Sequence, residues 1–137
     1  MAAPVPVQRT LSDGVKRTLR HITIPEGGDA DVAATIVVDT SALTGGGVTA
    51  TTHKIIKIQY ALHGFAVNLH FDATTDVHAV SLTGSGTLDF NFFGGLTNNA
   101  GAGITGDIVM TTNGIAALDD ENDDNTGFFI IETEKVV

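Results

Sequence analysis

The feature that most constrains this chain is a period of two in the positions of its apolar residues. In residues 54–62 and again in residues 65–71, apolar side chains occupy every second position, with mostly polar or small residues between them. Because successive side chains of a β-strand point to opposite faces, each segment is predicted to be a strand with one buried face. The predicted core face consists of Ile56, Ile58, Tyr60, Leu62, Phe65, Val67, Leu69 and Phe71.

Only two residues, His63 and Gly64, separate these two segments. A two-residue connection between paired strands needs positive φ, which glycine adopts freely and histidine tolerates better than most residues. The sequence therefore predicts a β-hairpin in which residues 54–62 pair with residues 65–71.

Shorter runs rich in β-branched residues alternate with clusters of Gly, Asn, Asp and Thr through the rest of the chain, and no apolar pattern of helical period persists. Together with the two segments above they make about eight strands, which predicts an all-β fold. The expected architecture is an antiparallel, jelly-roll-like β-sandwich, and a small closed barrel is the alternative. The further strands are expected at residues 20–24, 32–39, 77–82, 87–90, 107–112 and 127–136.

The first residues differ from the rest of the chain. Pro4 and Pro6 favour an extended conformation without helix. Residues 1–20 hold four basic residues against one acidic residue, in a chain whose net charge is −9. We therefore predict an extended basic N-terminal arm at residues 1–17 and a single β-sandwich domain at residues 18–137. The arm is expected to dock on an acidic protein surface, and a solvated terminus is the alternative.

Composition disfavours several kinds of stabilisation and partner. The chain has no cysteine, so neither disulfides nor thiolate metal sites hold the fold. Its negative charge disfavours nucleic acid as a partner, because like charges repel the phosphate backbone. The start lacks a signal-peptide pattern and no apolar run is long enough for a membrane span. We expect a soluble protein that is made in a cytoplasm and has no membrane partner.

Several glycine-rich motifs are better explained by turns than by chemistry. Residues 101–106 spell G-x-G-x-x-G, but the dinucleotide-binding form of this motif needs a following helix, whereas residues 107–112 have strand composition. The sequence Gly84-Ser85-Gly86 lacks the spacing of a nucleophile elbow. Residues 94–103 form a long non-periodic segment, which is typical of a binding loop or a mobile one.

Two groups of polar residues have the chemistry of metal ligands. His70, Asp72, Asp76 and His78 are close enough in sequence to converge across a turn, but surface residues flanking that turn are the favoured interpretation. The acidic residues of 119–125 do not fit an EF-hand loop, so we favour a solvated turn over a weak cation site. No spacing marks a nucleophile with its base. We therefore predict no catalytic residue, no metal ligand and no cofactor, and hence a protein that is not an enzyme.

The sequences VNLHFDATTD (67–76), LDFNFFGGL (88–96) and GDIVMTT (106–112) resemble small virion structural proteins of tailed bacteriophages, most closely capsid decoration or cement proteins. This resemblance implies a β-rich homo-oligomer, with a trimer favoured, that binds the major capsid protein on the outside of the virion. An extended N-terminal arm is also typical of that family. The candidate partner-binding residues are Arg9, Lys16, Arg17 and Arg20 near the arm, and Leu96, Asn98 and Asn99 in the glycine-rich segment.

Two other functions remain open from the sequence. One is a β-module associated with a phage tail or baseplate, which has the same kind of fold. The other is a carbohydrate-binding β-sandwich, which one Tyr and no Trp disfavour because sugar rings stack on such side chains.

Overall fold

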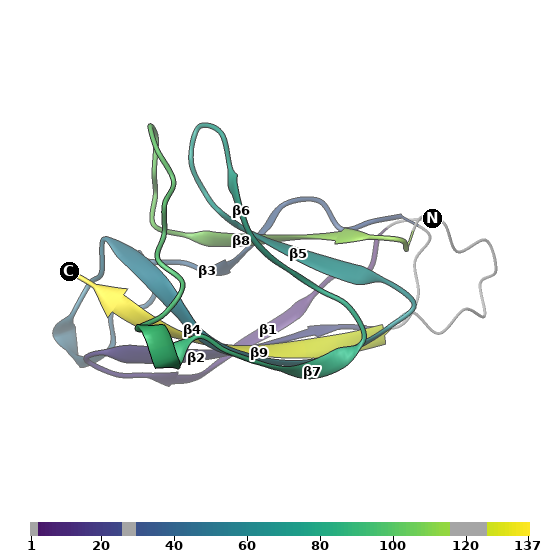
Figure 1. Cartoon of the computed structure of the whole chain (residues 1–137), viewed down its shortest axis with the longest axis horizontal. Helices are drawn as coiled ribbons and strands as arrows, with labels where there is room; N and C mark the ends of the chain where they lie inside the picture. Colours follow the sequence, from purple (N-terminus) through teal and green to yellow (C-terminus); the bar gives the residue numbers. More distant parts are fainter. Residues whose placement is uncertain (1–2, 26–29, 116–125) are drawn as a thin grey trace.

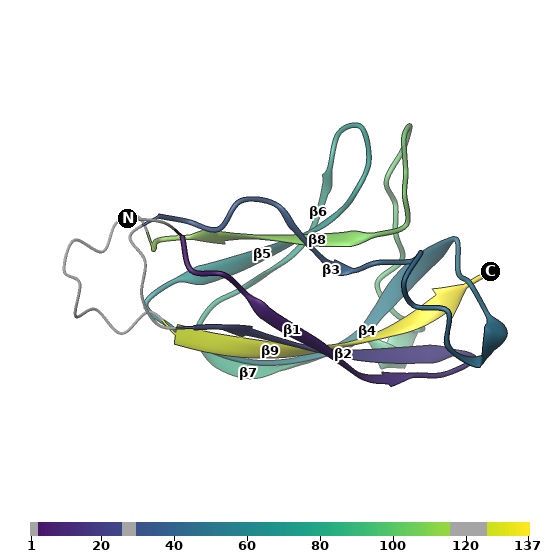
Figure 2. The same ribbon diagram turned by 180° about the vertical axis from the view of Figure 1, so that it is seen from behind.

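The computed structural model describes residues 3–25, 30–115 and 126–137, and these form two antiparallel β-sheets packed face to face (Figures 1 and 2). Sheet A has the order β1-β2-β9-β4-β7, and sheet B has the order β3-β8-β5-β6. Two 3-10 turns, η1 (Gly45–Gly47) and η2 (Asn91–Phe93), lie between strands. The strands are β1 (Val7–Asp13), β2 (Arg17–Ile24), β3 (Thr35–Val38), β4 (Thr52–His63), β5 (Ala66–Phe71), β6 (Val77–Leu82), β7 (Ser85–Asp89), β8 (Ile108–Asn113) and β9 (Thr126–Val136).

The connectivity of strands β2 to β9 is that of a jelly roll. The chain crosses to the other sheet at almost every connection, so that the orders β2-β9-β4-β7 and β3-β8-β5-β6 result. Only β5 and β6 follow each other within one of these two sets of four strands. The predicted all-β, jelly-roll-like sandwich is thus confirmed, and β1 adds a further strand at the edge of sheet A.

The predicted hairpin between residues 54–62 and 65–71 is wrong. Strand β4 pairs with β9 and β7, whereas β5 pairs with β8 and β6 in the other sheet. Gly64, with a φ of 86°, lies in the connection that carries the chain from one sheet to the other, and no non-glycine residue in the described part of the chain has a positive φ. An alternating pattern is the same for two strands that pair side by side and for two that face each other across a core, which is why the pattern misled.

The core lies between the two sheets. Of the predicted core residues, Ile58, Leu62, Phe65, Val67, Leu69 and Phe71 are in it, and Tyr60 packs half-buried against it. Ile56 is buried but is not part of this cluster, because the register of β4 against β9 shifts between Ile55 and Lys57 and places Ile55 on the core face.

Residues 7–13, which were predicted as part of an extended arm, are extended but belong to sheet A. As strand β1 they pair with β2 from Val7 opposite Thr23 to Asp13 opposite Thr18. The register shifts between Thr10 and Ser12, so Leu11 is an extra residue in β1 and the hydrogen-bond ladder at this edge of the sheet is irregular. The arm and the sandwich therefore share one sheet.

Candidate partner-binding face

The most exposed large aromatic residues of the described chain lie on η2, directly after β7. Phe92 is 86% exposed and Phe93 is 55% exposed. Their rings meet edge to face with centres 4.8 Å apart, and Phe93 meets Phe90 in the same way at 6.0 Å. We call residues 90–95 the Phe92–Phe93 turn. Two adjacent exposed phenylalanines form an apolar patch, which makes this turn a candidate contact for a partner.

Backbone hydrogen bonds hold both ends of this turn on strand β4. The Phe90 amide donates to the Ile56 carbonyl at 2.8 Å, and Leu96 exchanges two hydrogen bonds with Ile55, at 2.8 and 3.1 Å. Gly95 closes the turn with a φ of +102°, and its amide donates to the Phe90 carbonyl at 2.9 Å. A Cβ atom at Gly95 would lie 2.8 Å from the Ile56 Cδ1 atom, and a φ of +102° is strained for other residues, so both observations favour glycine here. The two rings are thus presented on a preorganised backbone.

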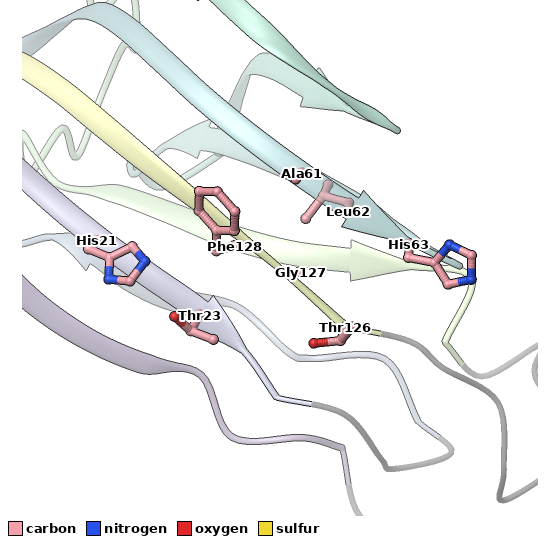
Figure 3. Close-up of a pocket in the computed structure, with 8 residues that line it drawn as sticks. All are labelled: His21, Thr23, Ala61, Leu62, His63, Thr126, Gly127 and Phe128. Carbon is pink, nitrogen blue, oxygen red and sulfur yellow. The ribbon is translucent and has the colours of Figure 1, made fainter.

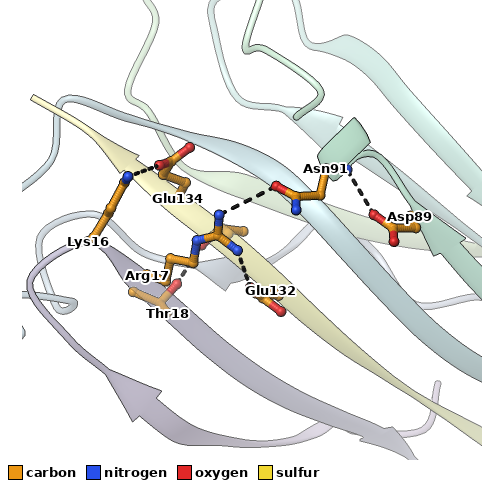
Figure 4. A network of polar contacts seen from close by, with 8 residues as sticks. Lys16, Arg17, Thr18, Asp89, Asn91, Glu132 and Glu134 are labelled. Carbon is orange, nitrogen blue, oxygen red and sulfur yellow. Dashed lines mark hydrogen bonds and ion pairs between the residues drawn. The ribbon is translucent and has the colours of Figure 1, made fainter. Parts of the chain in front are cut away.

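A network of charges connects the turn to the outer face of sheet A (Figure 4). Arg17 on β2 forms an ion pair with Glu132 on β9 at 2.8 Å and reaches Asn91 in the turn at 3.4 Å. The Asn91 backbone amide donates to the Asp89 carboxylate at 2.8 Å, and Lys16 pairs with Glu134 at 3.3 Å. Because its cations pair with carboxylates across the strands, this part of an acidic molecule presents little net charge to a partner.

A shallow pocket of about 530 Å³ opens on the same outer face, towards the end of the sheet where β4 ends and β9 begins (Figure 3). The His21 ring meets the Phe128 ring edge to face with centres 5.8 Å apart. The described residues that line it include two histidines and no carboxylate, and they present apolar surface with hydroxyl and imidazole groups. It is lined by His21, Thr23, Ala61, Leu62, His63, Thr126, Gly127 and Phe128.

At the opposite end of the sandwich, the space between the two sheets contains buried polar side chains. The Lys135 side chain is 1% exposed, and its ammonium group pairs with Asp13 at 2.9 Å and donates to the carbonyls of Gly45 and Val48 at 3.0 Å each. Asp13 in turn accepts a hydrogen bond from the Gly45 amide at 2.8 Å. These bonds join β1, β9 and the η1 loop, so the cluster is a structural connection and has no access to a ligand.

His53, opposite Lys135 on the neighbouring strand, is fully buried. Its Nδ1 atom lies 3.0 Å from the Thr133 hydroxyl, which also contacts the Thr18 hydroxyl. Burial, and secondly the charge of Lys135, lower the pKa of His53 to about 4. The imidazole is therefore neutral near pH 7.

The structure places the predicted partner-binding residues in different settings. Arg9 is exposed on β1, and Lys16 and Arg17 take part in the network above. Arg20 is half-buried, because its guanidinium donates to the Val37 carbonyl at 2.9 Å, to Thr10 at 2.8 Å and to Gln8 at 2.5 Å. Lys16, Arg17 and Arg20 thus each contact a partner within the chain.

The predicted residues of the glycine-rich segment are also separated. Leu96 is held on Ile55 and packs against the core, so it anchors the segment. Asn98 accepts a hydrogen bond from the Ala100 amide at 3.0 Å, and Asn99 is exposed. The Phe92–Phe93 turn was not among the predicted partner-binding residues. Two consecutive phenylalanines beside Gly94-Gly95, after a strand, are the signal that indicates it.

The sequence motifs are accounted for by the fold where the structure describes them. Residues 101–106 lead into strand β8 and not into a helix, as the strand composition of residues 107–112 predicted. Residues 119–125 lie outside the described residues. Within the described ranges, no group of three or more His, Asp or Glu side chains converges as a metal site. None of the helices in those ranges has the length and apolarity that a membrane crossing requires.

Comparisons with known proteins do not identify a family. No protein-family model and no curated protein matches the chain. Among solved structures, a cupin domain from Bordetella pertussis Tohama I is 12% identical, covers 100% of this chain and 99% of its own, and has a TM-score of 0.41. A cupin superfamily protein from Desulfitobacterium hafniense DCB-2 is 7% identical, the match covers 100% of this chain and 83% of that protein, and the TM-score is 0.36. Such scores carry no argument, so the assignment to the jelly-roll β-sandwich class comes from this chain's own strand order.

Proposed function

We propose that this chain is a non-enzymatic virion structural protein of a tailed phage, a capsid decoration protein that binds the outer surface of the major capsid shell. The observation that carries the proposal is the exposed, backbone-anchored Phe92–Phe93 turn. In this proposal the turn and the surrounding outer face of sheet A contact the capsid, and copies of the chain associate with one another as trimers.

The energetics of the turn suit a binding role. Burying an exposed phenylalanine side chain is worth about 1.5–3 kcal/mol, and aromatic residues dominate the binding energy of protein interfaces. Because β4 already holds the turn in place, binding does not require ordering this loop, a cost that otherwise reduces affinity. The charge-balanced network around Arg17 also avoids the repulsion that two acidic proteins would otherwise experience.

The fold and the sequence resemblance support the same proposal. Jelly rolls are a common architecture of viral capsid domains. A tail- or baseplate-associated β-module remains the second candidate, because it would use the same kind of surface. The copy number in the virion distinguishes the two: a decoration protein is present in proportion to the major capsid protein, and a tail module in a few copies.

The test uses virions purified from a phage that lacks the gene for this chain. Purified protein is added back over a range of concentrations, and its binding is measured by co-sedimentation. Truncating a central interface aromatic costs about 2 kcal/mol or more, so the double change Phe92→Ser and Phe93→Ser is expected to weaken binding by at least about thirty-fold. Its unfolding free energy should change little, because both side chains are exposed.

The matched control is Ile36→Ser on β3, which removes a 44% exposed apolar side chain from the other sheet. This variant is expected to bind like the wild type. Wild-type binding by the double phenylalanine variant would refute the assignment of the turn as the capsid contact. Failure of the wild-type protein itself to bind these virions would refute the decoration function.

A further inference from the structure

Two histidines lie directly opposite each other on the outer face of sheet B. Strands β5 and β6 pair with His70 opposite His78, and the ring centres are 5.2 Å apart. The register shift between Leu69 and His70 produces this pairing: without it, Ala79 would lie opposite His70. His70 points outward because its neighbours Leu69 and Phe71 are buried in the core.

The separation of the rings is that of two imidazoles on one tetrahedral ion. With a zinc–nitrogen bond of about 2.0–2.1 Å and a ring nitrogen about 1.1–1.2 Å from its ring centre, the ion lies about 3.2 Å from each ring centre. At a tetrahedral angle the two ring centres are then about 5.2 Å apart. The observed separation is 5.2 Å, and the interplanar angle of 74° is compatible with two imidazoles on one ion, because each ring plane can rotate about its zinc–nitrogen bond. His78 is exposed, so its ring turns without disturbing the core.

Hydrogen bonds indicate which nitrogen is free. The Ser81 hydroxyl donates its single proton to Asn68 at 2.7 Å, so its oxygen accepts from His78 Nε2 at 3.1 Å. Neutral His78 therefore carries its proton on Nε2 and has an unprotonated Nδ1. His70 Nε2 lies 3.4 Å from the Thr111 hydroxyl, and no hydrogen bond described in the structure involves the Nδ1 atom of either ring. Hydroxyl contacts on one nitrogen leave the other available as a ligand.

From this geometry we infer that His70 and His78 form a two-histidine chelating site for Zn²⁺, with water completing the coordination. Imidazole is a preferred ligand of zinc, and a site with two protein ligands leaves positions open. Asp72 and Asp76, which the sequence places nearby, accept hydrogen bonds from Thr105 at 2.8 Å and from the Ala73 amide at 3.1 Å, and in the described part of the chain no third His, Asp or Glu converges with the two histidines. The site lies on sheet B, away from the Phe92–Phe93 turn on sheet A, and does not depend on the proposed function.

The test is isothermal titration of the untagged full-length chain with ZnCl₂ at neutral pH. Saturable binding of one ion per chain with micromolar affinity is expected. His70→Ala and His78→Ala should each weaken binding by about ten-fold or more, because chelation by two linked ligands is lost. The control His63→Ala removes an exposed histidine at the end of β4 and should leave the affinity unchanged.

Two further measurements establish that imidazoles, and only these two, hold the ion. A large excess of Ca²⁺ should not displace the zinc, because carboxylate sites take calcium and imidazole sites do not. In heteronuclear NMR spectra of the wild type, the ring signals of two of the five histidines should shift on zinc addition. Absence of saturation, wild-type affinity in both alanine variants, or equal loss in His63→Ala would each overturn the inference.

Discussion

At the scale of the residue, the buried Lys135 shows how one ion pair connects three parts of the chain. Its ammonium group has three acceptors, one from β1 and two from the η1 loop. A buried cation that is fully paired is tolerated, whereas a buried charge that has lost its partner is not. The contribution of Lys135 therefore lies in holding β1 and the loop in one arrangement.

Replacing Lys135 with Met should lower the free energy of unfolding by about 3–5 kcal/mol, because the Asp13 carboxylate loses its buried partner. The matched control is Lys16→Met, whose side chain is 73% exposed although it also pairs with a carboxylate on β9. Exposed ion pairs contribute little, so this control should cost less than about 1 kcal/mol. Equal urea midpoints for the two variants would contradict the structural role of the buried pair.

We predict that the free energy of unfolding depends on pH through His53. Its folded-state pKa of about 4 is below the ordinary value of 6.5, so the unfolded chain binds more protons between these values. Stability is then fully present above pH 6.5 and is lost as the pH falls towards 4. The contribution is on the order of 3 kcal/mol. His53→Gln should remove this dependence, and the measurement is the difference in unfolding free energy between wild type and variant at several pH values. A constant difference would show that His53 does not titrate in this way.

At the scale of the element, β1 links the N-terminal segment to the sandwich. It pairs with β2 along its length and supplies Asp13 to Lys135. Removing it exposes the backbone edge of β2 and leaves a buried ammonium group without its carboxylate. The N-terminal segment therefore contains two portions with different roles, one before Val7 and one from Val7 to Asp13.

Deleting residues 2–6, which carry no charge, removes the packing of Ala3 against the core, so it should change the unfolding free energy by no more than about 1 kcal/mol. Deleting residues 2–13 should cost at least about 3 kcal/mol, because Lys135 loses Asp13 in addition to the strand pairing. Asp13→Asn in the full-length chain separates the loss of the ion pair from the loss of β1. Equal stability of the two deletions, measured by urea unfolding, would show that β1 is a dispensable arm.

At the scale of the whole molecule, the two sheets have different outer surfaces. The outer face of sheet A has the aromatic turn, the charge network and the shallow pocket, whereas the outer face of sheet B has the polar His70 and His78. The jelly-roll connectivity produces this separation, because consecutive strands alternate between the sheets and distribute neighbouring sequence motifs to opposite sides. The proposed partner contact and the proposed zinc site therefore lie on different faces.

The sequence by itself determined the all-β class, every described strand except β1, and the buried face of residues 58–71. A period of two reports which face of a strand is buried, and the burial of apolar surface provides most of the driving force for folding, so these features are readable locally. Residues 77–82 were predicted to be a strand, and β6 has those bounds.

Only the tertiary structure decided which strands pair, and hence which residues meet. Backbone hydrogen bonds join strands whatever their side chains, so the pattern of residues 54–71 fits a hairpin and a crossing between sheets equally well. The pairing of His70 with His78 depends on a single shift in register. The exposure of Phe92 depends on the hydrogen bonds between the Phe92–Phe93 turn and β4, which join segments far apart in the sequence. Such contacts between distant segments have no local signature, because many arrangements bury the same apolar residues.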